Sequence, residues 1–531
     1  MPEGGAVGLN SYGGRFLGFS ILDYTVILIY LLAVVFFGIW SAGRQKSARD
    51  YFLGGRNMPW WAVLFSVVAT ETSTLTFISI PAVAYGGNLT FLQLTIGYIL
   101  GRVAVALWFL PAYFEGELST VYQYLSNRFG PGIRRVAGST FIITRLLADG
   151  VRLFATAIPL AIIIRMAGAF PEWGDLQIYA LAIALIASVT LLYTLLGGIR
   201  AVIWMDVVQM GVYLGGAFFA ILWLLYQIPV SGGEALSMLA GEGKLQLFVW
   251  GAELSWREFL ADPYVFWIAL FGGAVFSVAS HGTDQLIVQR LLATKTLRES
   301  QKALVWSGIA ATLQFALFLG IGLLLWVFYM GESPAGLGLQ TADEVFALYI
   351  VEQIPVGVAG LIVAALIAAA MSSLSSSLNA LASSTTWDLI KPLYGSRWTS
   401  ETELKISRCV TVFWGIVLTG SALLFAWLQL GGGERPAIVE LGLGIASYTY
   451  GGLLGIFLFG LLFSRPDRRD AMIGFFTGLI ALLFMVEGPL QALLPGEGLA
   501  IAWPLYTLVG SVIVVAAGNL SWWIRSLLKK A

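Results

Sequence analysis

Hydrophobic residues occur along this chain in long runs that are separated by short polar connections. Because a helix needs about 20 apolar residues to cross roughly 30 Å of hydrocarbon, the pattern predicts about thirteen membrane-spanning helices. We expect these helices over residues 21–42, 60–85, 89–114, 136–168, 177–196, 200–228, 263–289, 303–330, 345–387, 406–430, 437–463, 470–494 and 500–526. The run over 345–387 is too long for one crossing, so we expect its helix to continue beyond the membrane after Asn379.

The composition excludes several classes of protein. Of 531 residues, 58% are hydrophobic and 11% are charged, whereas a soluble domain carries roughly 25% charged residues. The net charge is zero, and nothing in the sequence provides the clustered Lys and Arg that a nucleic-acid partner would need. The sequence holds one cysteine, Cys409, and one histidine, His281, so neither an intrachain disulfide nor a thiolate or imidazole metal cage is expected. We find no pair of a nucleophile and a base, and we therefore do not expect an enzyme.

Basic residues gather in alternate connections between the predicted helices, and the intervening connections are mostly acidic. The basic connections hold Arg44, Lys46, Arg49 and Arg56; Arg128, Arg134 and Arg135; Arg200; Arg290, Lys295, Arg298 and Lys302; Lys391, Arg397 and Lys405; Arg465, Arg468 and Arg469; and Arg525, Lys529 and Lys530. Cytoplasmic loops of membrane proteins carry an excess of Lys and Arg. The alternation predicts a multi-pass protein of the plasma or inner membrane with its N terminus outside and its C terminus in the cytoplasm.

Polar residues interrupt the second predicted helix at its centre. Between Ala69 and Thr76 the sequence places five hydroxyl side chains and the carboxylate of Glu71. A helix in a membrane can unwind only beside protein or an aqueous cavity, and transporters use such breaks to bind ions and solutes. An acidic residue inside a membrane is costly, so Glu71 indicates a cavity site, with a role in helix packing as the alternative.

A second interruption lies five predicted helices later. The segment from Ser277 to Gln285 contains His281 and Asp284 within an otherwise apolar run. Two interrupted helices at matching positions of two five-helix halves are typical of an inverted repeat. His281 lies beside this break, and a lone histidine in such a place is more often a structural group than a functional one.

The ninth predicted helix carries a face of serines. Ser372, Ser375 and Ser376 lie at offsets 0, 3 and 4, so they share one side of the helix, with Ser373 beginning a neighbouring face. Hydroxyl oxygens suit a hard cation, although small residues also form packing seams between membrane helices. Asp206, near the start of the sixth predicted helix, is either a cation ligand or a carboxylate that favours a helix N terminus.

The fourth predicted helix carries Arg145, Asp149 and Arg152 at offsets 0, 4 and 7. These side chains face one way and can neutralise one another. They form either a structural salt-bridge ladder or a binding site for an anionic solute.

Five motifs follow one another on the expected helices. They are Tyr51-Phe52-Leu53-Gly54-Gly55-Arg56; the segment from Tyr193 to Ala201 with Gly197-Gly198; Trp204-x-Asp206-x-x-Gln209; Asp284-Gln285-x-x-x-Gln289-Arg290; and Ser372-Ser373-Leu374-x-x-x-Leu378-Asn379. Together they resemble the sodium–solute symporter family, which includes sodium–galactose, sodium–sialic acid and sodium–proline symporters. Ile199 departs slightly from the Leu, Met or Phe that is usual in the second motif. The resemblance runs from about Phe19 to the last predicted helix.

The resemblance implies an all-α membrane fold of two inverted five-helix repeats. Core helices one and six are the broken helices, with one extra leading helix and two extra trailing helices. The implied boundaries are an extracellular tail over 1–19, the leading helix over 20–44, the first repeat over 58–228, an extracellular loop over 229–262, the second repeat over 263–463, and the trailing helices with the cytoplasmic C terminus over 464–531.

The resemblance also implies two sodium sites. Matched position by position, the main site has backbone ligands at Ala69, Thr72 and Ala369 and side-chain ligands at Ser372 and Ser373. The second site, which some members of the family have, has its ligands at Asp206, Ser372, Ser375 and Ser376.

The positions that bind the solute match less completely. Ser73 and Thr76 match residues that contact the substrate carboxylate in sialic acid carriers. Glu71 matches an acid of proline carriers and an Asn of sugar carriers, and Asp284 stands where galactose carriers have an Asn. The arginine that pairs with the carboxylate of sialic acid has no counterpart at its own position, but Arg145 and Arg152 flank it.

The sequence therefore predicts a secondary active transporter, functional as a monomer in membrane lipid. We expect it to import a sugar, a sugar acid or an amino acid by alternating access, with Na⁺ as the co-transported ion, two Na⁺ per solute and no organic cofactor. A proton-coupled carrier of the same fold, which would use Glu71 or Asp206, is one alternative. A solute-gated channel or sensor is another.

Overall fold

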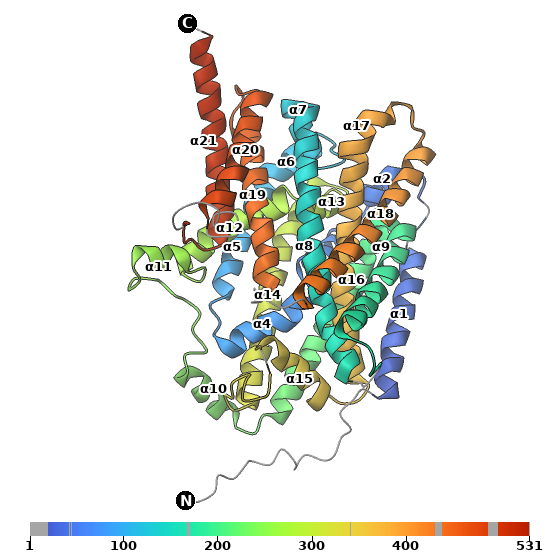
Figure 1. Cartoon of the computed structure of the whole chain (residues 1–531), viewed down its shortest axis with the longest axis vertical. Coiled ribbons are helices and arrows are strands. Elements are labelled where there is room, and N and C mark those ends of the chain that lie inside the picture. Colours follow the sequence, from blue (N-terminus) through green and yellow to red (C-terminus); the bar gives the residue numbers. More distant parts are fainter. Residues whose placement is uncertain are drawn as a thin grey trace, which may run out of the picture.

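The computed structural model describes residues 20–529 apart from 42, 44, 167–169, 340, 431–437 and 487–497. The predicted tail over 1–19 lies outside the described residues. Long helices run roughly along one direction (Figure 1). The described part of the chain has helices but no strands, which confirms the all-α prediction.

The α-helices follow one another along the whole chain. They are α1 (Ile21–Ser41), α2 (Ala48–Leu53), α3 (Trp60–Glu71), α4 (Thr74–Gly86), α5 (Leu92–Ala104), α6 (Leu110–Glu115), α7 (Tyr122–Phe129), α8 (Pro131–Met166), α9 (Asp175–Gln227), α10 (Gly232–Gly241), α11 (Trp256–Ala261), α12 (Phe266–Gly282), α13 (Gln285–Leu291), α14 (Leu297–Phe328), α15 (Asp343–Gln353), α16 (Val358–Ser384), α17 (Lys391–Tyr394), α18 (Ser400–Leu430), α19 (Ile438–Leu462), α20 (Arg468–Met485) and α21 (Pro504–Leu528).

Eight helices of the described chain are long and apolar enough to cross a membrane, and the broken pair α3 and α4 would make nine. The exposed apolar side chains of α1 also indicate that lipid surrounds the protein. Leu32 and Phe36 in this helix are 62% and 74% exposed. A soluble protein could not leave such a row of large apolar side chains in water. The count of thirteen crossings, the inverted repeat and the domain boundaries stay predictions.

Two of the predicted helices are joined in α9, which has 53 residues. A continuous helix of that length would measure about 80 Å, far more than the roughly 30 Å of hydrocarbon. The helix is interrupted at Gly198, whose backbone has φ 56° and ψ −157°. This interruption falls between the two predicted ranges, 177–196 and 200–228.

The long run over 345–387 is not one helix, contrary to the prediction. It forms α15, which ends at Gln353, and α16, which begins at Val358. Ile354 precedes Pro355 and has extended backbone (ψ 136°), as the ring of a following proline requires. α16 does continue past Asn379, as expected, and ends at Ser384.

α16 lies at the centre of the bundle and packs against α9, α1, α8 and α18. From Ala359 to Ser384 every residue except Leu361 is buried. The many Ala and Ser residues of this helix have small side chains, which allow neighbouring helices to approach its backbone closely. The serine face of the sequence is therefore enclosed by protein rather than exposed to lipid.

We expect the substitution Gly198→Ala to destabilise the protein. The backbone of Gly198 lies in a region that L-residues rarely adopt, at a cost on the order of 1–3 kcal/mol. A β-carbon there would also meet the backbone carbonyl of Tyr51. A lower melting temperature in detergent would show the effect. The control is Gly211→Ala in the same helix, where a β-carbon meets no atom within 4 Å and stability should be unchanged or slightly raised.

Candidate functional site

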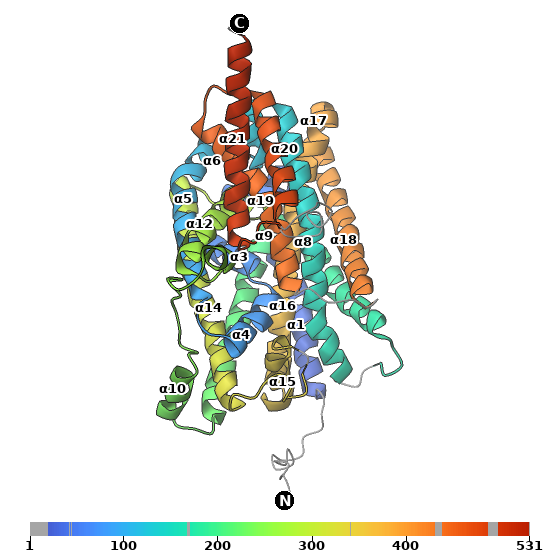
Figure 2. The same cartoon turned by 60° about the vertical axis from the view of Figure 1, so that its left-hand side comes forward.

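The first predicted break lies between α3 and α4, which meet at a bend of 62° (Figure 2). Thr72 and Ser73 between them have extended backbone, with ψ angles of 121° and 173°. Carbonyl groups at such a break lose their helical partners and become available to a cation. The side chain of Thr72 also accepts a hydrogen bond from Gln314 Nε2 at 2.7 Å, which ties the break to α14.

The second predicted break lies between α12, which ends at Gly282, and α13, which begins at Gln285. Asp284 caps α13 by accepting a hydrogen bond from the amide of Leu286 at 2.8 Å. Its carboxylate also pairs with Arg145 and accepts a hydrogen bond from the hydroxyl of Tyr450 at 2.6 Å. Asp284 is fully buried among these partners and does not line the cavity described below.

The residues predicted for the main sodium site lie on α3, at its break, and on α16. Ser373 Oγ donates to the carbonyl oxygen of Thr72 at 3.3 Å, which brings the two helices together at these oxygens. Ala69 and Ala369 are buried on the same two helices. Ser372 is buried as well, but its hydroxyl donates to Asp206 Oδ1 at 2.6 Å.

The residues predicted for the second sodium site also lie together. Asp206 of α9 accepts from Ser372 of α16, and the hydroxyls of Ser375 and Ser376 donate to the carbonyl of Ser372 at 3.0 and 2.7 Å. All four residues are buried. They form a small group of oxygens around one carboxylate.

Arg290 joins this oxygen group, which the sequence did not indicate. Its guanidinium contacts Ser376 and Asp206, and its Nε donates to Ser66 Oγ at 2.8 Å. Arg290 was expected among the basic residues of a connection between helices, but it lies within α13 and is buried. The residue ends an apolar run, and its 0% exposure depends on the folding of α13 into the bundle.

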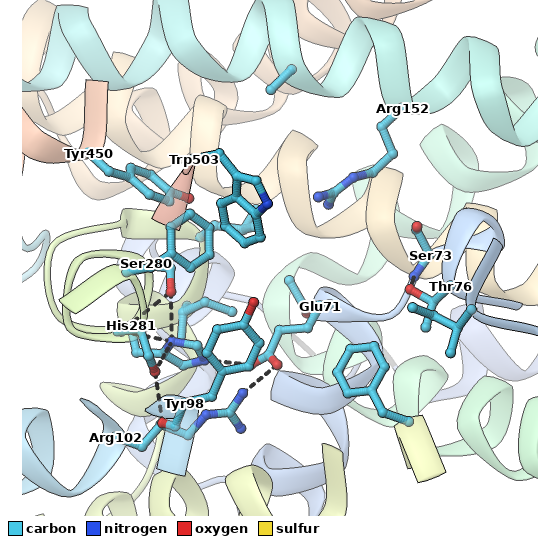
Figure 3. A pocket seen from close by; sticks show the side chains of 18 of the residues that line it. Glu71, Ser73, Thr76, Tyr98, Arg102, Arg152, Ser280, His281, Tyr450 and Trp503 are labelled. Carbon is cyan, nitrogen blue, oxygen red and sulfur yellow. Dashed lines mark hydrogen bonds and ion pairs between the residues drawn. The ribbon is translucent and has the colours of Figure 1, made fainter. Parts of the chain in front are cut away.

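A cavity of about 230 Å³ opens beside the two breaks. Of the predicted solute-binding residues, Glu71, Ser73, Thr76, Arg145 and Arg152 line it, and all of these except Arg145 are labelled in Figure 3. The wall also contains residues that were not predicted, namely Tyr98 and Arg102 from α5, Ser280 and His281 from α12, Tyr450 from α19, and Phe91, Phe276, Phe315 and Trp503. Arg102 could have been found from its place inside an apolar run, because a charge in a membrane helix indicates function. The aromatic residues carry no such signal.

Glu71 is engaged by two basic side chains, Arg102 and His281, at the wall of the cavity (Figure 3). Its carboxylate forms an ion pair with Arg102, and its Oε1 lies 2.5 Å from His281 Nε2. Arg102 in turn donates to Ser307 Oγ at 2.8 Å. The single histidine of the chain therefore belongs to a polar group that joins α3, α5, α12 and α14.

Arg145 and Arg152 have different surroundings, although they lie on one face of α8. Arg145 pairs with Asp284 and lies 3.4 Å from Asp149, so its charge is compensated. Arg152 projects into the cavity from the side opposite His281 (Figure 3), and within the described chain no carboxylate lies within ion-pair distance of it. The predicted ladder thus extends from Arg145 to Asp149 and does not include Arg152.

A second polar cluster joins helices at the end of the bundle where α7 and α17 lie, the upper end in Figure 1. Asp388, just after α16, accepts hydrogen bonds from Arg134 Nε at 2.6 Å, Thr120 Oγ1 at 2.5 Å and Ser384 Oγ at 2.9 Å. Gln285 of α13 bonds to the amide of Val121 at 2.9 Å. These contacts tie α8, the end of α16 and α13 to the segment before α7 at this end of the bundle.

A solved structure resembles the whole chain. It is described as the substrate-bound, outward-open state of a Na⁺-coupled sialic acid symporter, with a TM-score of 0.81 and 28% sequence identity. The match covers 95% of this chain and 98% of that one.

Curated relatives are also sodium-coupled transporters. The sodium/sialic acid symporter SiaT of Proteus mirabilis (strain HI4320) is 29% identical, over 95% of both chains. The sodium/sialic acid symporter NanT of Aliivibrio fischeri (strain ATCC 700601 / ES114) is 30% identical, over 95% of this chain and 93% of its own. The human sodium/iodide cotransporter is 29% identical, over 88% of this chain and 70% of its own.

The model of the sodium:solute symporter family matches residues 51–478, a range that includes both breaks, the serine face and every cavity-lining residue named above except Trp503. The predicted resemblance is therefore confirmed, and with it a multi-pass membrane transporter, rather than an enzyme, with Na⁺ as its co-transported ion. This chain belongs to the sodium:solute symporter family.

Proposed function

We propose that this transporter imports a small organic anion with a carboxylate group, together with two sodium ions, by alternating access. The cavity beside the breaks holds the solute. The main sodium site consists of Ala69, Thr72, Ala369, Ser372 and Ser373, and the second consists of Asp206, Ser372, Ser375 and Ser376. The N terminus lies outside the cell and the C terminus in the cytoplasm.

The main support for this proposal is the position of the Arg152 guanidinium group in the cavity. A charged side chain without a partner is costly inside a membrane protein. Such a residue is therefore expected where a bound ligand supplies the opposite charge. The guanidinium of Arg152 projects into the cavity, and no described carboxylate compensates it. Guanidinium and carboxylate groups match in shape and form two parallel hydrogen bonds.

Two further observations favour an anion over an amine or a neutral sugar. The carboxylate of Glu71, which could have received an ammonium group, is already bound to Arg102 and His281. The solutes that the reported relatives are named for, sialic acid and iodide, are both anions at neutral pH.

Sodium at the main site would couple ion and solute through a shared conformation. Its ligands join α16 to the break after α3, and Glu71 and Ser73, which flank Thr72, line the cavity. Sodium bound there would hold the wall of the cavity in place, and the solute would favour sodium binding to the same extent. Each sodium ion gains roughly 2.3 kcal/mol from a membrane potential of 100 mV.

Sodium-dependent binding and flux test this function. Purified protein is heated with sugar acids, short monocarboxylates, neutral sugars and amino acids, in sodium and in potassium buffer. We expect carboxylates to raise the melting temperature only in sodium. Uptake of the best ligand into proteoliposomes should then carry one net positive charge per solute. Stabilisation by neutral sugars alone, or uptake driven by a proton gradient without sodium, would contradict the proposal.

The cluster around Asp388 should close the cytoplasmic side of the cavity while the other side is open. We expect Asp388→Asn to weaken this closure, because Arg134 would lose the negative charge of its buried partner. In a Cys409→Ser background, a cysteine at the buried Thr386 should react faster with a maleimide applied from the cytoplasmic side. Glu401→Gln, which removes the exposed pair with Lys405, is the control and should leave the labelling rate unchanged. Equal labelling in both variants would disprove the closure.

A further inference from the structure

Arg290 is a fully buried arginine that belongs to neither proposed sodium site and does not line the cavity. It lies on α13, the second half of a broken helix, and its Nη1 donates to the carbonyl of Leu286 at 2.8 Å. Its other nitrogen atoms reach away from α13, toward α3, α9 and α16. Nε donates to Ser66 Oγ at 2.8 Å, and Nη2 contacts Asp206 Oδ2 at 3.4 Å and the hydroxyl of Ser376.

Two of these contacts fall on residues of the proposed second sodium site. Asp206 and Ser376 contribute oxygens to that site, and in this structure the guanidinium binds both. Asp206 Oδ2 also accepts from Ser66 at 2.5 Å, so Ser66 is the bridge between the arginine and the carboxylate. Among the described residues, Arg290 is the cation that compensates the buried charge of Asp206.

A sodium ion and this guanidinium would be close neighbours around one carboxylate. Like charges at such distances repel strongly where water is excluded, and all of these side chains are buried. One carboxylate compensates only one of the two cations. Occupation of the site by sodium therefore requires the guanidinium to leave Ser376.

We propose that Arg290 is a tethered cation that competes with sodium for the second site. In the conformation seen here it holds the place of the ion, and sodium enters by displacing it. Because Arg290 belongs to α13, the exchange releases one contact between the broken helix and α16, which links ion binding to movement of that helix. This inference rests on the proposed function, since it needs the second site to bind sodium.

The variant Arg290→Gln tests the competition directly. Glutamine keeps hydrogen-bond donors near Ser376 but has no charge, so Asp206 would be buried without a cation. We expect the sodium concentration that gives half-maximal thermal stabilisation to fall about tenfold, in potassium-balanced buffer of constant ionic strength. The double variant Asp206→Asn with Arg290→Gln should not bind sodium more tightly than the wild type, because the carboxylate charge that sodium would compensate is absent.

A second variant keeps the test decisive if Arg290→Gln does not fold. Ser66→Ala removes the hydrogen bond from Arg290 Nε and the one to Asp206 Oδ2, without removing any oxygen of the proposed sodium sites. We expect a smaller change in the same direction, about threefold. Sodium binding that is unchanged or weaker in every folded variant that loosens Arg290 would overturn the inference.

Failure of the proposed function would look different in the same assay. If the wild-type protein shows no sodium-specific stabilisation, and Ser373→Ala changes nothing, then the sodium sites themselves are wrong. If Ser373→Ala removes sodium stabilisation while the Arg290 variants match the wild type, only the competition is disproved.

Discussion

Ser373→Ala is expected to abolish sodium-driven uptake. Ser373 Oγ lies 3.3 Å from the carbonyl oxygen of Thr72, where α16 meets the break after α3. In the proposed main site both oxygens bind the ion, so the variant removes a ligand and a link between the two helices. We expect sodium affinity to fall on the order of 100-fold. Uptake of the identified solute into proteoliposomes, measured across a range of sodium concentrations, gives the result.

A serine one helical turn away provides the matched control. Ser377 is also buried on α16, and its hydroxyl donates to the carbonyl of Ser373 at 3.1 Å. It belongs to neither proposed sodium site, so Ser377→Ala should remove one local hydrogen bond and leave the sodium dependence unchanged. Full coupling in Ser373→Ala, or an equal loss in both variants, would show that the main site is assigned wrongly.

Loss of the Arg152 charge should impair transport nearly as much, but by weakening the binding of the solute rather than the binding of sodium. A hydrogen bond to a charged group contributes about 1.5–3 kcal/mol, so Arg152→Gln should raise the KM for a carboxylate solute roughly 10- to 150-fold. Sodium-dependent stabilisation without solute should stay as in the wild type. Arg152→Lys keeps the charge but cannot form two parallel hydrogen bonds, and its effect should be intermediate.

The control for this prediction lies on the same helix. Arg165 of α8 is partly exposed and pairs with Asp175 at 2.6 Å, away from the cavity. Arg165→Gln should leave the KM unchanged. The amide of the same solute, which has no charge, should bind wild type and Arg152→Gln equally weakly. A carboxylate KM that does not change in Arg152→Gln would remove the main support for an anionic solute.

The polar group around Glu71 narrows the alternatives that the sequence left open. From the sequence, Glu71 was a candidate for the solute-binding cavity, for helix packing or for proton coupling. The structure pairs it with Arg102 and His281 on neighbouring helices. We therefore propose that Glu71 positions these side chains at the wall of the cavity.

The sequence by itself determined the membrane-embedded helical fold and the breaks beside Glu71 and Asp284, but not the break between α15 and α16. Both follow from local chemistry, because apolar runs need lipid, and Glu71 or Asp284 inside such a run needs protein or water around it. It also identified the serine face of α16, because residues three and four positions apart always share one side of a helix.

Only the tertiary structure decided which charges compensate one another. Arg145 and Arg152 look equivalent in the sequence, yet one is bound to Asp284 and the other projects into the cavity. Arg290 looks like a loop charge, yet it lies against Asp206, 84 positions away. Pairing across distant helices depends on how they pack, and electrostatic energy depends on burial and distance, which a single sequence does not contain.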